Sequence, residues 1–152
     1  DMPLSQILLD GEGWKRVPAR EAPLRVAARP ETHSADGRTR FLLIDGSPFV
    51  WAGPAVPEGG DVNFRAAPYA PLRTKRGETS IAVTGLATDR DGRIYAATEV
   101  GVQVFDPTGR LCGVLTPAAP GKPEHLRFEG DTLTLWIGDA KYARKLNTEG
   151  AK

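Results

Sequence analysis

The sequence has little of what several common functions need. One cysteine, Cys112, stands among 152 residues, which excludes an internal disulfide and indicates a small core residue in an apolar strand. The two histidines, His33 and His125, lie in unlike contexts, and a lone histidine on a strand is more often packed or exposed than catalytic. No serine lies in a Gly-x-Ser-x-Gly frame, so no nucleophile elbow is visible.

An excess of one charge sign and long hydrophobic runs are also missing. Twenty basic and 19 acidic residues leave a net charge of +1, so no bulk field exists that would recruit nucleic acid or an anionic membrane. No apolar run approaches the roughly 18 residues of a membrane span. We therefore expect a soluble protein without a nucleic-acid or membrane partner, and cytoplasmic and bacterial extracytoplasmic locations both stay open.

Glycine and proline are plentiful instead. The chain has 17 glycines and 13 prolines, scattered along its length, which favours many turns and short strands over long helices. Apolar residues make up 40% of the chain, enough for a soluble domain with a real core. The composition therefore predicts a single all-β domain over residues 1–152.

The stretch 83–115 shows this organisation most clearly. Turns are predicted at Asp91-Gly92, at Gly101 and over residues 106–109, because glycine adopts positive φ without steric cost and Asp hydrogen-bonds its own backbone. Short apolar segments separate these turns at intervals of about 10 residues, as in up-and-down antiparallel sheets, sandwiches and propeller blades. We therefore predict four short antiparallel strands here.

Three units of this kind can be overlaid. Their starts lie about 55 and about 40 residues apart, which brackets the propeller-blade period of roughly 40 to 50 residues. The predicted architecture is about three propeller-like blades of antiparallel strands, and the alternative is a compact β-sandwich or barrel. The predicted parts are a lead-in strand at 1–17, a degenerate blade at 36–67, the best blade at 81–116 and a last blade at 124–147.

The best blade and the residues after it carry a family resemblance. The runs 85–89, 91–98, 101–106 and 144–151, with the opening 3–14, resemble the C-terminal blades and lead-in of the senescence-marker-protein/gluconolactonase/luciferin-regenerating-enzyme-like family. The resemblance implies six-bladed propellers about twice this length, with a divalent cation, usually calcium or zinc, on the axis. It also implies hydrolysis of a sugar lactone or related ester by a metal-bound water.

The sequence departs from that family at the metal ligands. Thr84 stands where the family has an aspartate, and threonine offers one neutral oxygen where a hard cation prefers a carboxylate. The middle blades, which would supply two asparagines, have no counterpart, and no Glu-Gly-Pro follows the lead-in. No complete metal site can be carried over. Asp61, Asn63 and Asp89 are the candidate ligands.

Candidate ligand-binding residues lie outside the best blade. Trp51 and Tyr69 could stack on sugar rings, although core packing is the commoner use of such aromatics. Arg73 belongs to a basic cluster that could bind an anion, although a solvated loop is the commoner context in a charge-balanced chain.

Three blades cannot close a ring, since propellers have about four or more. A second copy could complete it, the chain could be one piece of a larger parent protein, or the strands could form a compact sandwich. Two functions follow. The first is a non-catalytic binding or assembly domain derived from a sugar-lactonase-type propeller. The alternative is a metal-dependent sugar-lactone or ester hydrolase, using calcium or zinc, whose site is completed by another subunit or by the missing part of a longer chain. A carbohydrate or lactone is the expected ligand.

Overall fold

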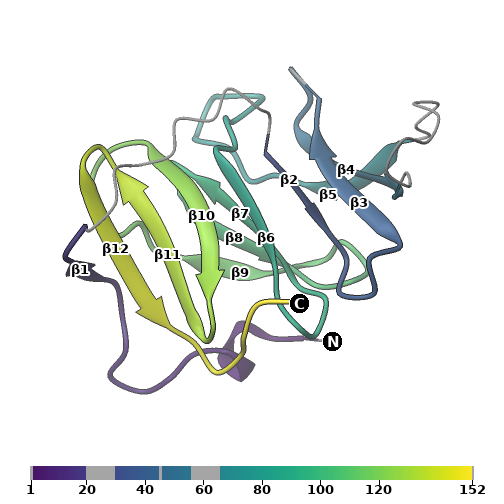
Figure 1. The fold of residues 1–152 in the computed structure, drawn as a ribbon. Helices are drawn as coiled ribbons and strands as arrows, with labels where there is room; N and C mark the ends of the chain where they lie inside the picture. Colours follow the sequence, from purple (N-terminus) through teal and green to yellow (C-terminus); the bar gives the residue numbers. More distant parts are fainter. Residues whose placement is uncertain (1, 20–29, 45, 56–65, 152) are drawn as a thin grey trace.

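The computed structural model describes residues 2–19, 30–44, 46–55 and 66–151, and within them it confirms the all-β prediction. Twelve strands form three four-stranded antiparallel sheets, and one short 3-10 turn, η1 (Leu4–Gln6), precedes them (Figure 1). We call the sheets the first, central and last blade. The first blade holds β2 (Glu31–His33), β3 (Thr39–Leu43), β4 (Phe49–Pro54) and β5 (Ala67–Pro71). The central blade holds β6 (Gly85–Thr88), β7 (Ile94–Thr98), β8 (Gly101–Phe105) and β9 (Leu111–Leu115). The last blade holds β10 (Pro123–Glu129), β11 (Thr132–Ile137), β12 (Ala140–Lys145) and β1 (Lys15–Val17).

The blades are arranged as neighbouring sectors of a propeller. The first strands of the three blades, β2, β6 and β10, lie side by side, and the remaining strands fan outwards from them (Figure 1). Apart from β1, the strands of each blade follow one another outwards in sequence order, with the innermost strand first. This arrangement excludes the compact sandwich or barrel.

The last blade is completed from the other end of the chain. Strand β1 pairs antiparallel with β12, with Lys15 opposite Ala143 and Val17 opposite Lys141. The predicted lead-in strand thus forms the outermost strand of a sheet whose other strands come from the C-terminal residues. A strand of three residues at a sheet edge offers little backbone for unwanted pairing.

The first blade is longer than the 36–67 predicted from the sequence. It begins at Glu31, the first residue of β2, and it ends at Pro71, the last residue of β5, a strand that contains two prolines. Proline is tolerated in β5 because this strand is the outermost one of its sheet. Residues 45 and 56–65 of the predicted blade lie outside the described residues.

One turn motif recurs in the central blade. The carboxylate of Asp89 accepts hydrogen bonds from the backbone N–H groups of Asp91 (2.9 Å) and Arg93 (3.0 Å). Asp106 binds Thr108 N (2.8 Å) and Arg110 N (3.0 Å) in the same way. The glycine before each arginine has φ near 90°, a conformation that glycine adopts without strain. The pattern Asp-x-x-Gly-Arg therefore fixes both hairpin ends.

Two apolar clusters hold the blades together. One lies between the central and last blades and includes Tyr95, Val104, Leu133 and Leu135. The other lies between the first and central blades and includes Phe41, Val50, Ile94 and Phe105. The central blade is therefore covered on both faces, and every residue of β6, β7 and β8 is buried. Among the described residues, no helix is long and apolar enough to span a membrane.

Candidate functional site

We call the end of the molecule at which the innermost strands β2, β6 and β10 begin the axial end. Thr84 lies directly before β6 at this end, next to the start of β10. Its hydroxyl donates a hydrogen bond to the carbonyl of Pro123, and its backbone N–H donates to Ala97 O at 3.0 Å. The Thr84 hydroxyl therefore ties the segment before β6 to the start of β10, and its correspondence to a metal-ligand position stays a prediction.

The start of β10 is distorted. The pairing of β10 with β11 shifts between Glu124 and Arg127, and His125 within this bulge has φ of 55°. Few residues other than glycine adopt a left-handed conformation, and bulges often re-aim a side chain near a functional site. His125 is half-buried and the neighbouring Glu124 is exposed. The bulge therefore brings an imidazole and a carboxylate to the axial end, without a hydrogen bond that joins them.

The candidate metal ligands are not brought together by the described part of the chain. Residues 2–19, 30–44, 46–55 and 66–151 contain no group of three or more His, Cys, Asp or Glu side chains suited to hold a metal ion. Asp61 and Asn63 lie outside the described residues, so their role as ligands stays a prediction. Among the three candidates, the structure describes Asp89 alone.

Asp89 is fully buried, and both of its oxygens are occupied. One oxygen binds the two backbone N–H groups of its turn, and the other accepts from Arg93 (3.0 Å) and from the Tyr95 hydroxyl (2.8 Å). Burial, together with the nearby Asp89 charge, raises the pKa of Tyr95 well above its ordinary value. Arg93 also donates to Gln6 Oε1 at 2.9 Å. Asp89 therefore organises a turn and anchors η1, and it has no free oxygen for a cation.

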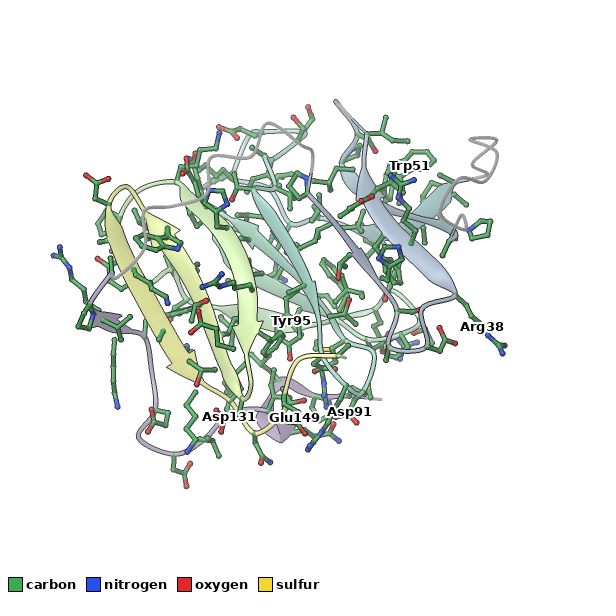
Figure 2. The ribbon with its side chains drawn as sticks, in the orientation of Figure 1. Arg38, Trp51, Asp91, Tyr95, Asp131 and Glu149 are labelled. Atoms are coloured by element: carbon green, nitrogen blue, oxygen red, sulfur yellow. The ribbon has the colours of Figure 1, made fainter. Side chains whose placement is uncertain are left out.

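A groove runs along the innermost strands towards the opposite end. It has a volume of about 590 Å³ and is lined by residues from β2, β6 and β10 and by the C-terminal residues. Within it the hydroxyls of Thr32 and Thr88 are 2.8 Å apart, and Thr88 donates to His33 O at 2.6 Å. Glu149, which is labelled in Figure 2, lines the same groove and binds Arg90 at 2.8 Å. Sequence reasoning missed this groove because its walls come from four distant segments.

The aromatic and basic candidates are scattered. Trp51 lies on the first blade, well away from Tyr95 in the central blade (Figure 2), and its indole N–H donates to Ser47 Oγ at 2.7 Å. Tyr69 packs against Phe41 with ring centroids 4.7 Å apart, and its hydroxyl donates to Asp106 O. Burial, followed by the Asp106 charge, raises the pKa of Tyr69.

Arg73 is held through its backbone and not through its guanidinium. The buried side chain of Gln103 accepts from Arg73 N at 2.7 Å and donates to Arg73 O at 2.8 Å. The neighbouring Lys75 is paired with Glu99. The structure therefore does not bring Trp51, Tyr69 and Arg73 together into one ligand site.

Comparison with known proteins places the fold. No protein-family model matches the chain, and no curated protein matches it significantly. Solved structures do match. A structural-genomics target assigned as a gluconolactonase aligns with a TM-score of 0.63 and 20% identity over 82% of this chain and 40% of its own. A gluconolactonase from Xanthomonas campestris gives 0.57 and 21% over 78% and 37%. The calcium-binding protein regucalcin from Agrobacterium tumefaciens gives 0.61 and 18% over 81% and 46%.

The chain therefore spans less than half the length of each of these three proteins. The resemblance predicted from residues 81–151 is confirmed at the level of fold. The three blades have the β-propeller fold of the gluconolactonase and regucalcin structures.

Proposed function

We propose that this chain is a non-catalytic binding or assembly module built on a sugar-lactonase-type propeller fold. The observation that supports the proposal is Thr84, which stands in the sequence where the resemblance implies a carboxylate and whose hydroxyl donates to the Pro123 carbonyl. A Lewis-acid hydrolase needs several oxygen ligands, preferably carboxylates, around one cation. Asp89, the described carboxylate nearest in sequence, already makes four hydrogen bonds inside a turn.

The proposal is tested by titration with calcium and zinc combined with a sugar-lactonase assay. We expect no stoichiometric cation binding below millimolar concentration and no hydrolysis above the spontaneous rate. The matched variant is Thr84→Asp, which restores a carboxylate at the axial position. If Thr84 were the sole defect, this variant would gain both affinity and turnover, whereas we expect neither. Tight binding with turnover in the unaltered chain would contradict the proposal.

A second function, metal-dependent hydrolysis of a sugar lactone or ester, is favoured by one observation. Two of the structural neighbours are gluconolactonases and one is a calcium-binding protein, and this chain covers less than half of each. A site completed by a partner would then draw on Asp61 and Asn63. Under this alternative, Asp61→Asn and Asn63→Ala each abolish turnover while the unaltered chain hydrolyses the lactone. Under the first proposal there is no turnover for them to abolish.

A further inference from the structure

Within the described part of the chain, the first and last blades each have one face that no other blade covers. On the first blade this end face carries Leu42, Phe49 and Trp51, because Leu42 pairs with Trp51 on the side opposite Phe41 and Val50. All three side chains are half-buried. We call this surface the first-blade end face.

The last-blade end face has the opposite character. A hollow of about 390 Å³ lies on it, lined by Val17, Pro18, Arg127, Glu129, Thr134, Lys141 and Ala143. Glu129 accepts from Arg127 at 2.7 Å and from Lys141 at 3.1 Å across the hollow. One end face therefore projects apolar rings, and the other offers a hollow whose rim carries Arg127 and Lys141, both paired with Glu129. Lysine and arginine side chains bind well over the face of a tryptophan, and their aliphatic stems cover apolar surface.

The connection from β1 to β2 is exceptional among the links between blades. Chain segments 72–84 and 116–122 each run from the outermost strand of one blade to the innermost strand of the adjacent blade. Strand β1 belongs to the last blade, whereas β2, the next strand in the sequence, belongs to the first, and the central blade lies between these two. The two consecutive strands would lie in adjacent blades if the last blade beside the first belonged to another copy.

We propose that two copies of this chain close a six-bladed ring, in which the β1 strand of each copy completes the last blade of the other. The first-blade end face of each copy then packs against the last-blade end face of its partner. The closed ring therefore contains this contact twice. Exchange of an identical element between protomers is a low-cost route to a dimer. The inference rests on the proposed assembly function and names its partner as a second copy.

The area of such a dimer is adequate. Four strands spaced about 4.8 Å apart, each with about five residues of about 3.3 Å, give a sheet face of roughly 300 Å². Two contacts, each with two faces, then bury roughly 1,200 Å², which reaches the lower end of specific protein interfaces. The exchanged β1 strands add further backbone hydrogen bonds.

The experiment uses one engineered disulfide across the β1–β12 pair, in a Cys112→Ser background that removes the single natural cysteine. Lys15 and Ala143 are direct cross-strand partners, and antiparallel neighbours lie within disulfide distance. The chain carrying both Lys15→Cys and Ala143→Cys is oxidised and run on a denaturing gel without reductant. We expect a covalent dimer of about twice the 16.3 kDa chain mass. A link confined to one chain, or no link at all, would overturn the exchange.

Two single-cysteine chains provide the control. A Lys15→Cys chain refolded together with an Ala143→Cys chain links to it if β1 is exchanged, and does not link if β1 folds back on its own last blade.

The end faces are tested separately with Leu42→Glu, which places a charge on the apolar end face, and the control is Ser80→Glu, at an exposed residue of the connection between the first and central blades. Leu42→Glu is expected to raise the dimer dissociation constant roughly 30-fold or more, and Ser80→Glu to leave it unchanged. Equal effects of the two variants would contradict the end-face contact. A monomer that neither binds cations nor hydrolyses lactones would sink this inference and leave the non-catalytic proposal standing.

Discussion

The central blade and the two end blades are built on the same four-stranded plan, yet they are buried very differently. Every residue of β7 and β8 is buried, whereas most residues of β3 and β12 are half-buried. The difference follows from position, because the central blade has a sheet packed against each face. A strand covered on both faces reads as a continuous apolar run, and one covered on a single face alternates. This is why residues 81–116 gave the clearest prediction.

The polar residues of the central blade also differ from those of the end blades. Asp89, Arg93 and Gln103 are buried, and each is hydrogen-bonded to several partners. On the last-blade end face, Glu129 and Arg127 are exposed and Lys141 is half-buried. Buried pairs are costly to break from one side, whereas exposed pairs contribute little. Substitution of these polar residues should therefore lower the unfolding free energy much more in the central blade than on the last-blade end face.

The largest effect is expected for Asp89→Ala, which leaves the buried Arg93 guanidinium without its main partner and removes the cap of the turn. Loss of one member of a buried ion pair costs about 3–5 kcal/mol of unfolding free energy. The matched control is Asp91→Ala, because Asp91 also contacts Arg93 (3.2 Å) but is exposed. We expect the control to lose about 1 kcal/mol or less. Urea unfolding followed by tryptophan fluorescence measures both, and similar losses would contradict the assignment of Asp89 as the organising carboxylate.

A smaller difference in unfolding free energy is expected within the first blade, between substitutions at Val50 and at Leu42, which lie on opposite faces of the sheet. Val50 is 1% exposed and packs towards the central blade, whereas Leu42 belongs to the end face. Val50→Ala should reduce the unfolding free energy by roughly 2 kcal/mol through lost burial and a residual cavity. Leu42→Ala should cost about 1 kcal/mol or less in dilute protein, and more as the concentration rises. If Leu42→Ala cost as much as Val50→Ala at every dilution, the end face would be part of the core.

The smallest effect on folding stability at neutral pH concerns the buried tyrosines of the central and first blades. This effect grows as the solution becomes alkaline. Burial and nearby carboxylates raise the pKa of Tyr95 and of Tyr69 above the ordinary value of 10.0. A group whose pKa is raised by folding contributes stability that is fully present below the unfolded pKa and is lost as pH rises above it. We therefore expect the urea midpoint to be level up to about pH 10 and to fall above it.

The readout is phenolate absorbance during an alkaline titration. We expect Tyr95 and Tyr69 to ionise together with unfolding, in one cooperative step. Smooth ionisation of all tyrosines before any change in circular dichroism would contradict the buried contacts of both hydroxyls.

Much of the fold could be predicted from local turn chemistry. Asp91-Gly92 and the segment 106–109 specify tight turns through side-chain and glycine effects that act within a few residues. What these features share is that their causes lie within about ten residues of chain.

The rest depended on contacts between distant segments. Strand β2 has three residues and no alternation, so nothing local marks it as a strand. Proline disfavours the interior of a sheet, and β5 tolerates Pro68 and Pro71 because it lies at a sheet edge. Asp89 looked like a ligand because its partners Arg93 and Tyr95, and the link to Gln6, become visible when the chain is folded. The groove between β2, β6 and β10 could not be predicted for the same reason.

The measurement that tests the account most directly is the mass of the unaltered chain at sedimentation equilibrium over a wide concentration range. A three-bladed half-ring with two complementary end faces should associate with its own copy and stop at the dimer. The predicted result is a single species of about twice 16.3 kDa that dissociates on dilution. A mass of one chain at every concentration, or open-ended growth beyond the dimer, would contradict it.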